Sequence, residues 1–246
     1  MKNKGLFFLL VSAMLWLAGC GGQTGNGNSA QPATGSGSAN GTFDPALATG
    51  ASTKAAISHV YEGLAGLVNN QPTLLLAVDM TASEDKLDYV VTLRPGVTFH
   101  DGTPLNADAV VLNFNRWFDP KDPLHGSGSY TGWSIPFGGF KGETTSTGNP
   151  KSEFDGIEKQ NELSVILHLN TPDPNLLSKL SDSALSIVSP AALKAPGFGT
   201  SSGTDGGTGP YKIGKWNGSS LTLDPNSSYW KSAAIPTASM DVTLAP

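Results

Sequence analysis

The stretch LRPGVTFHDGTP, Leu93 to Pro104, decides how this chain is interpreted, because it places His100 next to Asp101 in a sequence with only four histidines. The pair is either a metal-binding or catalytic site, or part of a structural turn. Local physics favours the turn, since Pro95-Gly96 reverses the chain and Asp101-Gly102 reverses it again. We therefore expect two turns around a short strand at 97–99, leading into a helix.

The segments on both sides of this stretch have clear periodicities. Residues 87–93 alternate apolar and polar, as in a strand with one buried face. On the other side, Asn106 is expected to cap a helix, NADAVVLNFNRWF, with Asp108 in its first turn. The apolar stripe of that helix contains Val110, Val111, Phe114, Trp117 and Phe118.

Further elements follow from the same signals. We expect a helix capped by Ser52 and running to about Leu67, a strand at 163–169, and a hairpin whose strands, 211–216 and 220–223, flank Asn217-Gly218. Gly, Pro and Ser enrichment predicts long loops at 119–149 and 195–209. Strands and helices alternate without repeats, so the predicted fold class is α/β, in the mixed α+β sense.

Motifs for chemistry are missing from the sequence. The four histidines have no ligand spacing such as i, i+4, no GxSxG elbow occurs, and GGTGPYK (206–212) lacks the ending of a phosphate loop. We expect no catalytic residues, no metal and no cofactor. A secreted hydrolase using His100 and Asp101 remains the alternative, although no nucleophile is evident.

Charge and cysteine content restrict the partners. The net charge is -5 and no run of Lys and Arg occurs, which argues against nucleic acid as a partner. Cys20 is the only cysteine, so an intramolecular disulfide is impossible.

The N-terminus has the pattern of a secretion signal. Two lysines precede a 13-residue apolar run, Leu6 to Ala18, which is too short to span a membrane. LAGC, Leu17 to Cys20, resembles the lipobox of bacterial lipoproteins, which implies a signal peptide at 1–20 and lipidation of Cys20. The alternative is an ordinary signal peptide that contains a cysteine. Residues 21–42 are rich in Gly and Ser and predict a flexible tether.

Four blocks resemble the peptide/nickel-type solute-binding proteins (family 5, oligopeptide- and dipeptide-binding) of bacterial ABC transporters. They are YVVTLRPGVTFHDGTPLNADAVVLNFNRW (89–117), FDPALATGASTKAAISHVYEGLAGL (43–67), SPAAL (189–193) and GTGPYKIGKWNGSSLTLDPNSSYW (207–230). The blocks occur in family order. The strand that in the family usually precedes the block at 43–67 is replaced here by the polar tether.

This resemblance implies a type II periplasmic-binding-protein-like lobe with an inserted smaller lobe. Residues 43–246 would form the N-terminal part of a solute-binding domain, without the second ligand lobe. The implied function is capture of peptides or similar small solutes for an ABC importer by two-lobe closure. The implied partners are the solute, the permease subunits and, through the lipid anchor, the cell membrane, at an extracytoplasmic location. The alternative is a non-transport surface protein or an inactive receptor fragment.

The resemblance also implies ligand-binding residues. An ungapped alignment from Asp44-Pro45 puts the segment that contacts a peptide backbone at Thr49, Gly50 and Ala51. Tyr130 and Trp133 lie where the family presents aromatic side chains from its inserted lobe, and Ser183 begins a segment that aligns with a cleft-facing one. A plain loop before a helix is the alternative for the first three residues, and anchoring of a loop is the alternative for the two aromatic ones. The carboxylate that holds a peptide amino terminus in the family would lie in the absent lobe.

Overall fold

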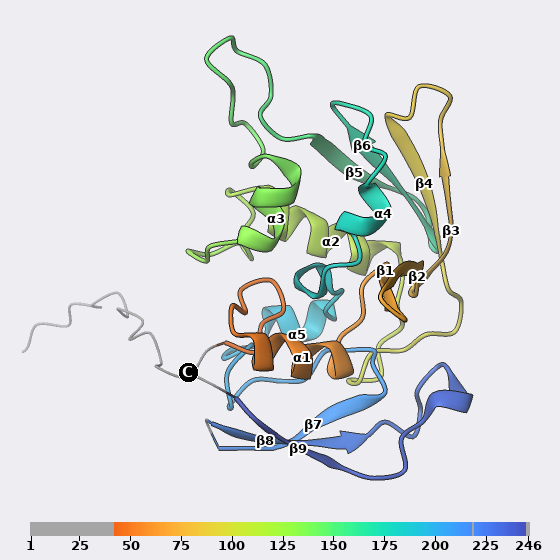
Figure 1. The fold of residues 1–246 in the computed structure, drawn as a ribbon, viewed down its shortest axis with the longest axis vertical. Coiled ribbons are helices and arrows are strands. Elements are labelled where there is room, and N and C mark those ends of the chain that lie inside the picture. The colour runs from red at the N-terminus through yellow and green to blue at the C-terminus, as the bar shows by residue number, and fades with distance from the viewer. Residues whose placement is uncertain (1–41, 218, 245–246) are drawn as a thin grey trace, which may run out of the picture. The chain divides into compact units, whose positions relative to one another are not determined.

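Antiparallel pairing builds each of the sheets in the computed structural model, which describes residues 42–217 and 219–244 (Figure 1). A ribbon pairs β1 (Ala65–Val68) with β2 (Gln71–Leu74), and a four-stranded sheet has the order β3 (Ala77–Ala82), β4 (Asp88–Leu93), β6 (Ser164–Leu169), β5 (Phe154–Asn161). A three-stranded sheet has the order β7 (Tyr211–Trp216), β8 (Ser220–Pro225), β9 (Met240–Thr243). The helices are α1 (Ala51–Val60), α2 (Ala107–Phe118), α3 (Thr131–Phe137), α4 (Leu176–Lys179) and α5 (Pro190–Lys194), with short 3-10 turns η1 (Ser183–Leu185) and η2 (Ser232–Ala234). The mixed α/β class is confirmed.

The expected signal peptide, Cys20 and the tether up to residue 41 lie outside the described residues.

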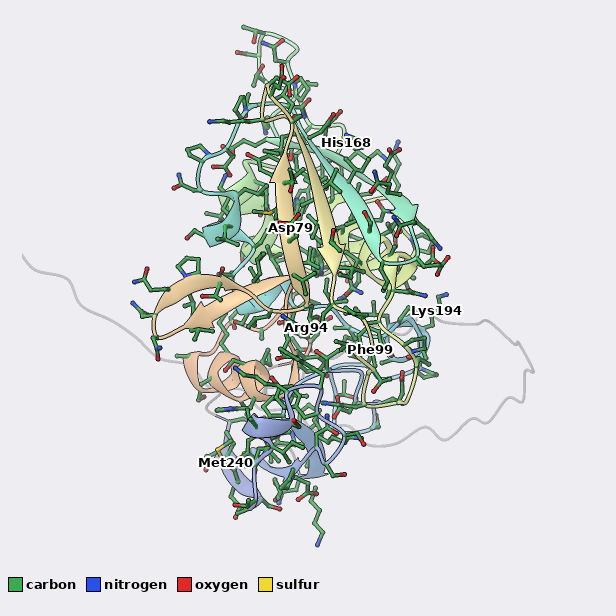
Figure 2. All side chains as sticks on the ribbon, turned by 90° about the vertical axis from the view of Figure 1, so that its right-hand side faces the viewer. Asp79, Arg94, Phe99, His168, Lys194 and Met240 are labelled. Carbon is green, nitrogen blue, oxygen red and sulfur yellow. The ribbon has the colours of Figure 1, made fainter. Side chains whose placement is uncertain are left out.

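The strand and helix around the opening stretch form as predicted. Burial alternates along β4, with Tyr89, Val91 and Leu93 inside. Asn106 caps α2, because its side-chain oxygen accepts a hydrogen bond from the Ala109 N–H at 3.0 Å. The expected strand at 163–169 is β6, where His168 lies on the solvent side and contacts Asp88 on β4 at 2.7 Å (Figure 2).

Two hydrophobic clusters hold the described part of the chain together. The first lies between α2, α3 and the four-stranded sheet and is rich in aromatic side chains, including Phe114, Trp117, Phe118, Trp133, Phe137 and Phe154. The second joins α1 and α5 to the three-stranded sheet and includes Phe43, Ile57, Val60, Leu193, Leu221 and Leu223. The expected hairpin at 211–223 is confirmed in its strands, while Gly218 in its turn lies outside the described residues.

Two expected elements were wrong in extent. The first helix begins after Gly50, which has no capping side chain, and ends at Val60 rather than near Leu67. It ends there because Tyr61 is extended and the Glu62 carbonyl accepts a hydrogen bond from the Ile187 N–H, which turns the chain into a bridge between Gly63 and Ser186. The expected loop at 119–149 contains α3, a short helix that the Gly and Pro content of the region concealed.

A buried ion pair ties the start of the described chain to α2. The Arg116 guanidinium donates to both carboxylate oxygens of Asp44, and the two side chains are 4% and 5% exposed. The Nε–H of Arg116 also donates to the Leu124 carbonyl at 3.2 Å. A bidentate pair of this kind fixes orientation as well as distance, so the segment at 43–48 is held in one position against α2.

We expect Asp44→Asn to destabilise the protein by about 3–5 kcal/mol, because it leaves the Arg116 charge buried without its partner. The measurement is the free energy of unfolding in urea. Asp108→Asn is the matched control, since Asp108 pairs with Lys159 at 2.9 Å with a side chain 64% exposed, where solvent screens the pair. Equal losses in the two variants would contradict this ranking.

Candidate functional site

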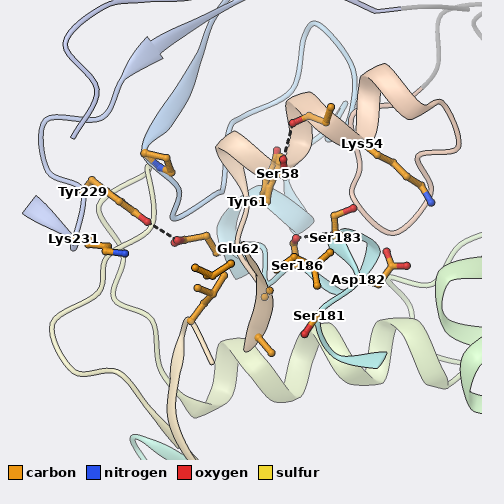
Figure 3. Close-up of a pocket in the computed structure, with 18 residues that line it drawn as sticks. Lys54, Ser58, Tyr61, Glu62, Ser181, Asp182, Ser183, Ser186, Tyr229 and Lys231 are labelled. Atoms are coloured by element: carbon orange, nitrogen blue, oxygen red, sulfur yellow. Dashed lines mark hydrogen bonds between the residues drawn. The ribbon is translucent and has the colours of Figure 1, made fainter. Parts of the chain in front are cut away.

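An open groove of about 620 Å³ lies between α1, β1 and the segment before η1 (Figure 3). Its lining residues are Lys54, Ala55, Ser58, Tyr61, Glu62, Gly63, Ala65, Gly66, Leu67, Val68, Leu75, Ser181, Asp182, Ser183, Ser186, Pro210, Tyr229 and Lys231. Lys54 and Asp182 lie on one side of it, and Tyr229 and Lys231 lie on the other (Figure 3). The groove therefore has charged groups at both ends and strand β1 along it.

The Glu62 carboxylate is buried in the floor of this groove and accepts three hydrogen bonds. One oxygen accepts from the Tyr229 hydroxyl at 2.7 Å. The other accepts from the Trp230 indole Nε1–H at 2.8 Å and from the Thr208 hydroxyl at 2.9 Å. These donors are far from Glu62 in sequence, so one side chain joins three segments of the chain.

The pKa of Glu62 is raised above its ordinary value, because burial disfavours the charged form more than the three donors and the nearby His100 favour it. Burial and the neighbouring Glu62 charge likewise raise the pKa of Tyr229, which keeps that hydroxyl a donor. Trp230 in turn packs under Arg94, whose guanidinium carbon lies 4.4 Å from the ring centroid.

The His100-Asp101 pair of the opening stretch is structural. His100 is 2% exposed in its side chain, and its ring nitrogens contact Asp205 at 2.9 Å and the Gly209 carbonyl at 3.0 Å. Asp101 accepts hydrogen bonds from Ser189 and from Thr103. These bonds fasten the predicted turn to the segments at 189 and 205–209, and neither ring nitrogen is left to act as a base.

Strand β1 has an unpaired edge beside the groove. Leu75 N–H donates to the Leu64 carbonyl at 2.9 Å, so Ala65 and Leu74 form a non-hydrogen-bonded pair in the β1–β2 register. The N–H and C=O groups of Ala65 and Leu67 therefore point away from β2. Among the described residues, no other strand pairs with this edge.

The opposite edge of the ribbon is closed to further pairing. Pro72 on β2 faces Leu67 in a non-hydrogen-bonded pair, so the position that would carry an outward N–H has none. On β1, by contrast, the side chains of Leu67 and Val68 are 60% and 40% exposed. Pro72 therefore interrupts the donors of the β2 edge, whereas the β1 edge is exposed at Leu67 and buried at Ala65, which is 2% exposed.

The sequence-predicted site residues are not brought together. Ser183 lines the groove. Thr49 and Ala51 are exposed and flank Gly50 at the start of α1. They lie about one helical turn from Lys54, which lines the groove. Tyr130 and Trp133 are each 1% exposed, and Trp133 lies within the aromatic cluster of α2 and α3 while Tyr130 stacks on His125. Their burial favours the alternative that they anchor the loop.

Sequence reasoning missed Glu62, Tyr229, Trp230 and the β1 edge as parts of the site. The signal was present in the blocks ending in YEGL and YW, which were noted for resemblance and not for chemistry. Within 42–217 and 219–244, no group of three or more His, Cys, Asp or Glu side chains is arranged to hold a metal ion. In the same ranges no helix is both long and apolar enough to cross a membrane.

Comparison with known proteins identifies the family. The family described as bacterial extracellular solute-binding proteins, family 5 Middle, matches residues 71–241. The chain belongs to this family. The match contains the opening stretch, α2, α3 and the segment of Thr208, Tyr229 and Trp230.

Individual relatives agree with that assignment. The glutathione-binding protein GsiB of Pectobacterium atrosepticum is 31% identical over 198 residues, which is 79% of this chain and 34% of the relative. Among solved structures, HbpA2 from Haemophilus parasuis matches with a TM-score of 0.69 and 26% identity over 85% of this chain and 42% of that one. DppA from Helicobacter pylori in complex with the peptide STSA matches with a TM-score of 0.67 and 25% identity, over 84% and 41%.

These solved structures confirm the expected periplasmic-binding-protein fold, and the family that matches is one of extracellular solute-binding proteins. The chain spans about a third of the length of the curated relatives it matches.

We expect Glu62→Gln to lower the free energy of unfolding by about 1–3 kcal/mol, because an amide offers one acceptor oxygen where three donors converge and directs its NH₂ at one of them. Urea unfolding measures the loss. Glu84→Gln is the control, since Glu84 is exposed and has no hydrogen bond among those of the described residues. A loss no larger than that of the control would show that the network contributes little.

The raised pKa of Glu62 also predicts a pH dependence. Between the unfolded and the folded pKa, the native state binds more protons than the unfolded state, so stability falls as pH rises. The stability difference between wild type and Glu62→Gln should therefore shrink as pH rises from about 4 and become constant above the folded pKa. A difference that grows with pH would mean that the three donors outweigh burial.

Proposed function

We propose that this chain is the ligand-capturing part of an extracytoplasmic solute-binding lipoprotein that delivers peptides or similar small solutes to an ABC importer. Family membership supports the importer, and the unpaired β1 edge in the groove supports a ligand with a peptide backbone. DppA from Helicobacter pylori is known with a bound peptide, and GsiB relatives are glutathione-binding proteins. Glutathione is itself a small peptide, so both neighbours favour the same ligand class.

An extended peptide would bind by adding a strand to β1. The outward backbone groups of Leu67, the exposed part of the β1 edge, would pair with the ligand backbone, which gives affinity without dependence on the ligand's sequence. The exposed side chains of Leu67 and Val68 would contact alternate ligand side chains. Water in the open groove would allow many ligand side chains to be accommodated.

The predicted site residues are part of this proposal. Ser183 would contact the ligand from the far wall of the groove. Thr49, Gly50 and Ala51 would contact it from the start of α1, where glycine permits close approach of a backbone. Direct contact of Tyr130 and Trp133 with the ligand stays a prediction. The alternative is that these two side chains anchor the loop on which they lie.

Anchoring and closure complete the proposed function. Diacylglycerol on Cys20 would hold the protein at the membrane, with 21–42 as its tether, near the permease subunits. A second lobe, as the resemblance implies, would close over the groove and bury the ligand. The alternative of a non-transport surface protein or an inactive receptor predicts that no ligand stabilises the fold.

A proline substitution on the β1 edge tests the proposal. Short peptides should raise the free energy of unfolding of the 246-residue chain by about 2.7 kcal/mol at 100 times the dissociation constant. Leu67→Pro should weaken binding about tenfold or more, because it removes an outward N–H that the β1–β2 ladder does not use.

Leu67→Ala is the matched control, since it keeps the N–H and removes the exposed side chain. Isothermal titration with tetra-alanine and with glutathione measures both variants. Equal weakening by the two substitutions would show that side-chain contact, and not strand addition, carries the binding. Absence of binding by wild type would exclude the proposed function for this chain.

A further inference from the structure

A second recess, of about 440 Å³, lies next to the groove and shares Lys231 with it. Its lining residues are Arg94, Pro95, Gly96, Trp230, Lys231, Ser232 and Ala233. It is built from the turn that follows β4 and from the segment that leads into η2. No function described so far uses it.

Arg94, labelled in Figure 2, lines this recess, and two contacts fix its orientation. Its Nε–H donates to the Leu75 carbonyl at 2.9 Å, and its guanidinium lies over the Trp230 ring. Trp230 is fixed from its other end by the bond to Glu62. The two terminal nitrogens of Arg94 have no hydrogen-bond partner within the described part of the chain, so a preorganised fork of donors remains available.

The recess carries uncompensated positive charge. Two cations line it, Arg94 and Lys231, and no Asp or Glu does. Lys231 is exposed and makes no side-chain hydrogen bond or ion pair among the described residues. The carboxylate of Glu62, which bonds to the indole of Trp230, accepts three hydrogen bonds and does not line the recess.

We propose that this recess binds a carboxylate, namely the free C-terminus of the captured peptide. The inference rests on the proposed function, because it sets the direction in which a peptide lies along β1. A planar guanidinium fork matches the two oxygens of a carboxylate, and Lys231 adds a second charge. Lys231 lines both spaces, so the two adjoin at this residue, and a ligand in the groove would reach the recess on the Tyr229 side.

The site can be tested without a peptide. The ¹⁵N-labelled 246-residue chain is titrated with acetate and, separately, with the neutral isostere acetamide, while the indole N–H signal of Trp230 and the Nε–H signal of Arg94 are followed by NMR. Saturable shifts with acetate and none with acetamide support the proposal, as does weaker acetate binding in Lys231→Gln. Lys215→Gln is the matched control, since Lys215 is exposed on β7 and lines neither space. Absence of a saturable acetate shift, or equal weakening in both variants, overturns the proposal.

A second arm identifies the source of the carboxylate. Tetra-alanine with a free C-terminus should bind wild type about tenfold more tightly than its C-terminal amide, as for a charge-assisted hydrogen bond. The ratio should fall toward one in Lys231→Gln and in Arg94→Lys, which keeps the charge and loses the fork. Equal affinities of acid and amide in wild type overturn the inference while the proposed function stands. If neither peptide binds, the proposed function fails and so does the peptide carboxylate as the occupant.

Discussion

The buried carboxylate of Glu62 is the constraint on which the groove depends. An ionised group out of water is tolerated only when its lone pairs are satisfied, and here Thr208, Tyr229 and Trp230 supply three donors. Each donor comes from a segment more than 140 residues away, so satisfying one charge fixes the return of the chain against the end of α1. The bond to Trp230 also positions the ring on which Arg94 lies. The hydrogen bonds of Glu62 therefore position residues of both the groove and the neighbouring recess.

The same logic accounts for the histidine–aspartate pair. His100 and Asp101 are adjacent but point to different partners, Asp205 and Ser189, which lie on two other segments. A catalytic pair would have to leave one nitrogen for a substrate, whereas His100 uses both. Both side chains therefore join segments that are far apart in sequence.

Local sequence patterns predict the regular helices and strands, but they do not predict contacts between segments that are far apart in sequence. β4, β6 and α2 followed from alternation, capping and an apolar stripe, because each is stabilised along its own length. The sequence predicts a first helix that continues past Val60, because Tyr61 and Leu64 keep its apolar spacing. Only the hydrogen bond from the Ile187 N–H to the Glu62 carbonyl shows that the backbone has turned. No local pattern could reveal that Glu62 bonds to Trp230, or that Trp133 packs on Trp117. Those facts depend on contacts between segments far apart in sequence.

The two edges of the β1–β2 ribbon are protected to different degrees. Exposed strand edges invite aggregation, and proteins close them with proline, charge or short length. The ribbon closes the β2 side with Pro72 and limits the β1 side to four residues, ending it at the left-handed Asn69 and Asn70. The edge that remains open is the one that lines the groove and carries the exposed Leu67 and Val68. An added strand, as the proposed function requires, would therefore pair at the β1 edge, where no proline interrupts the row of backbone donors.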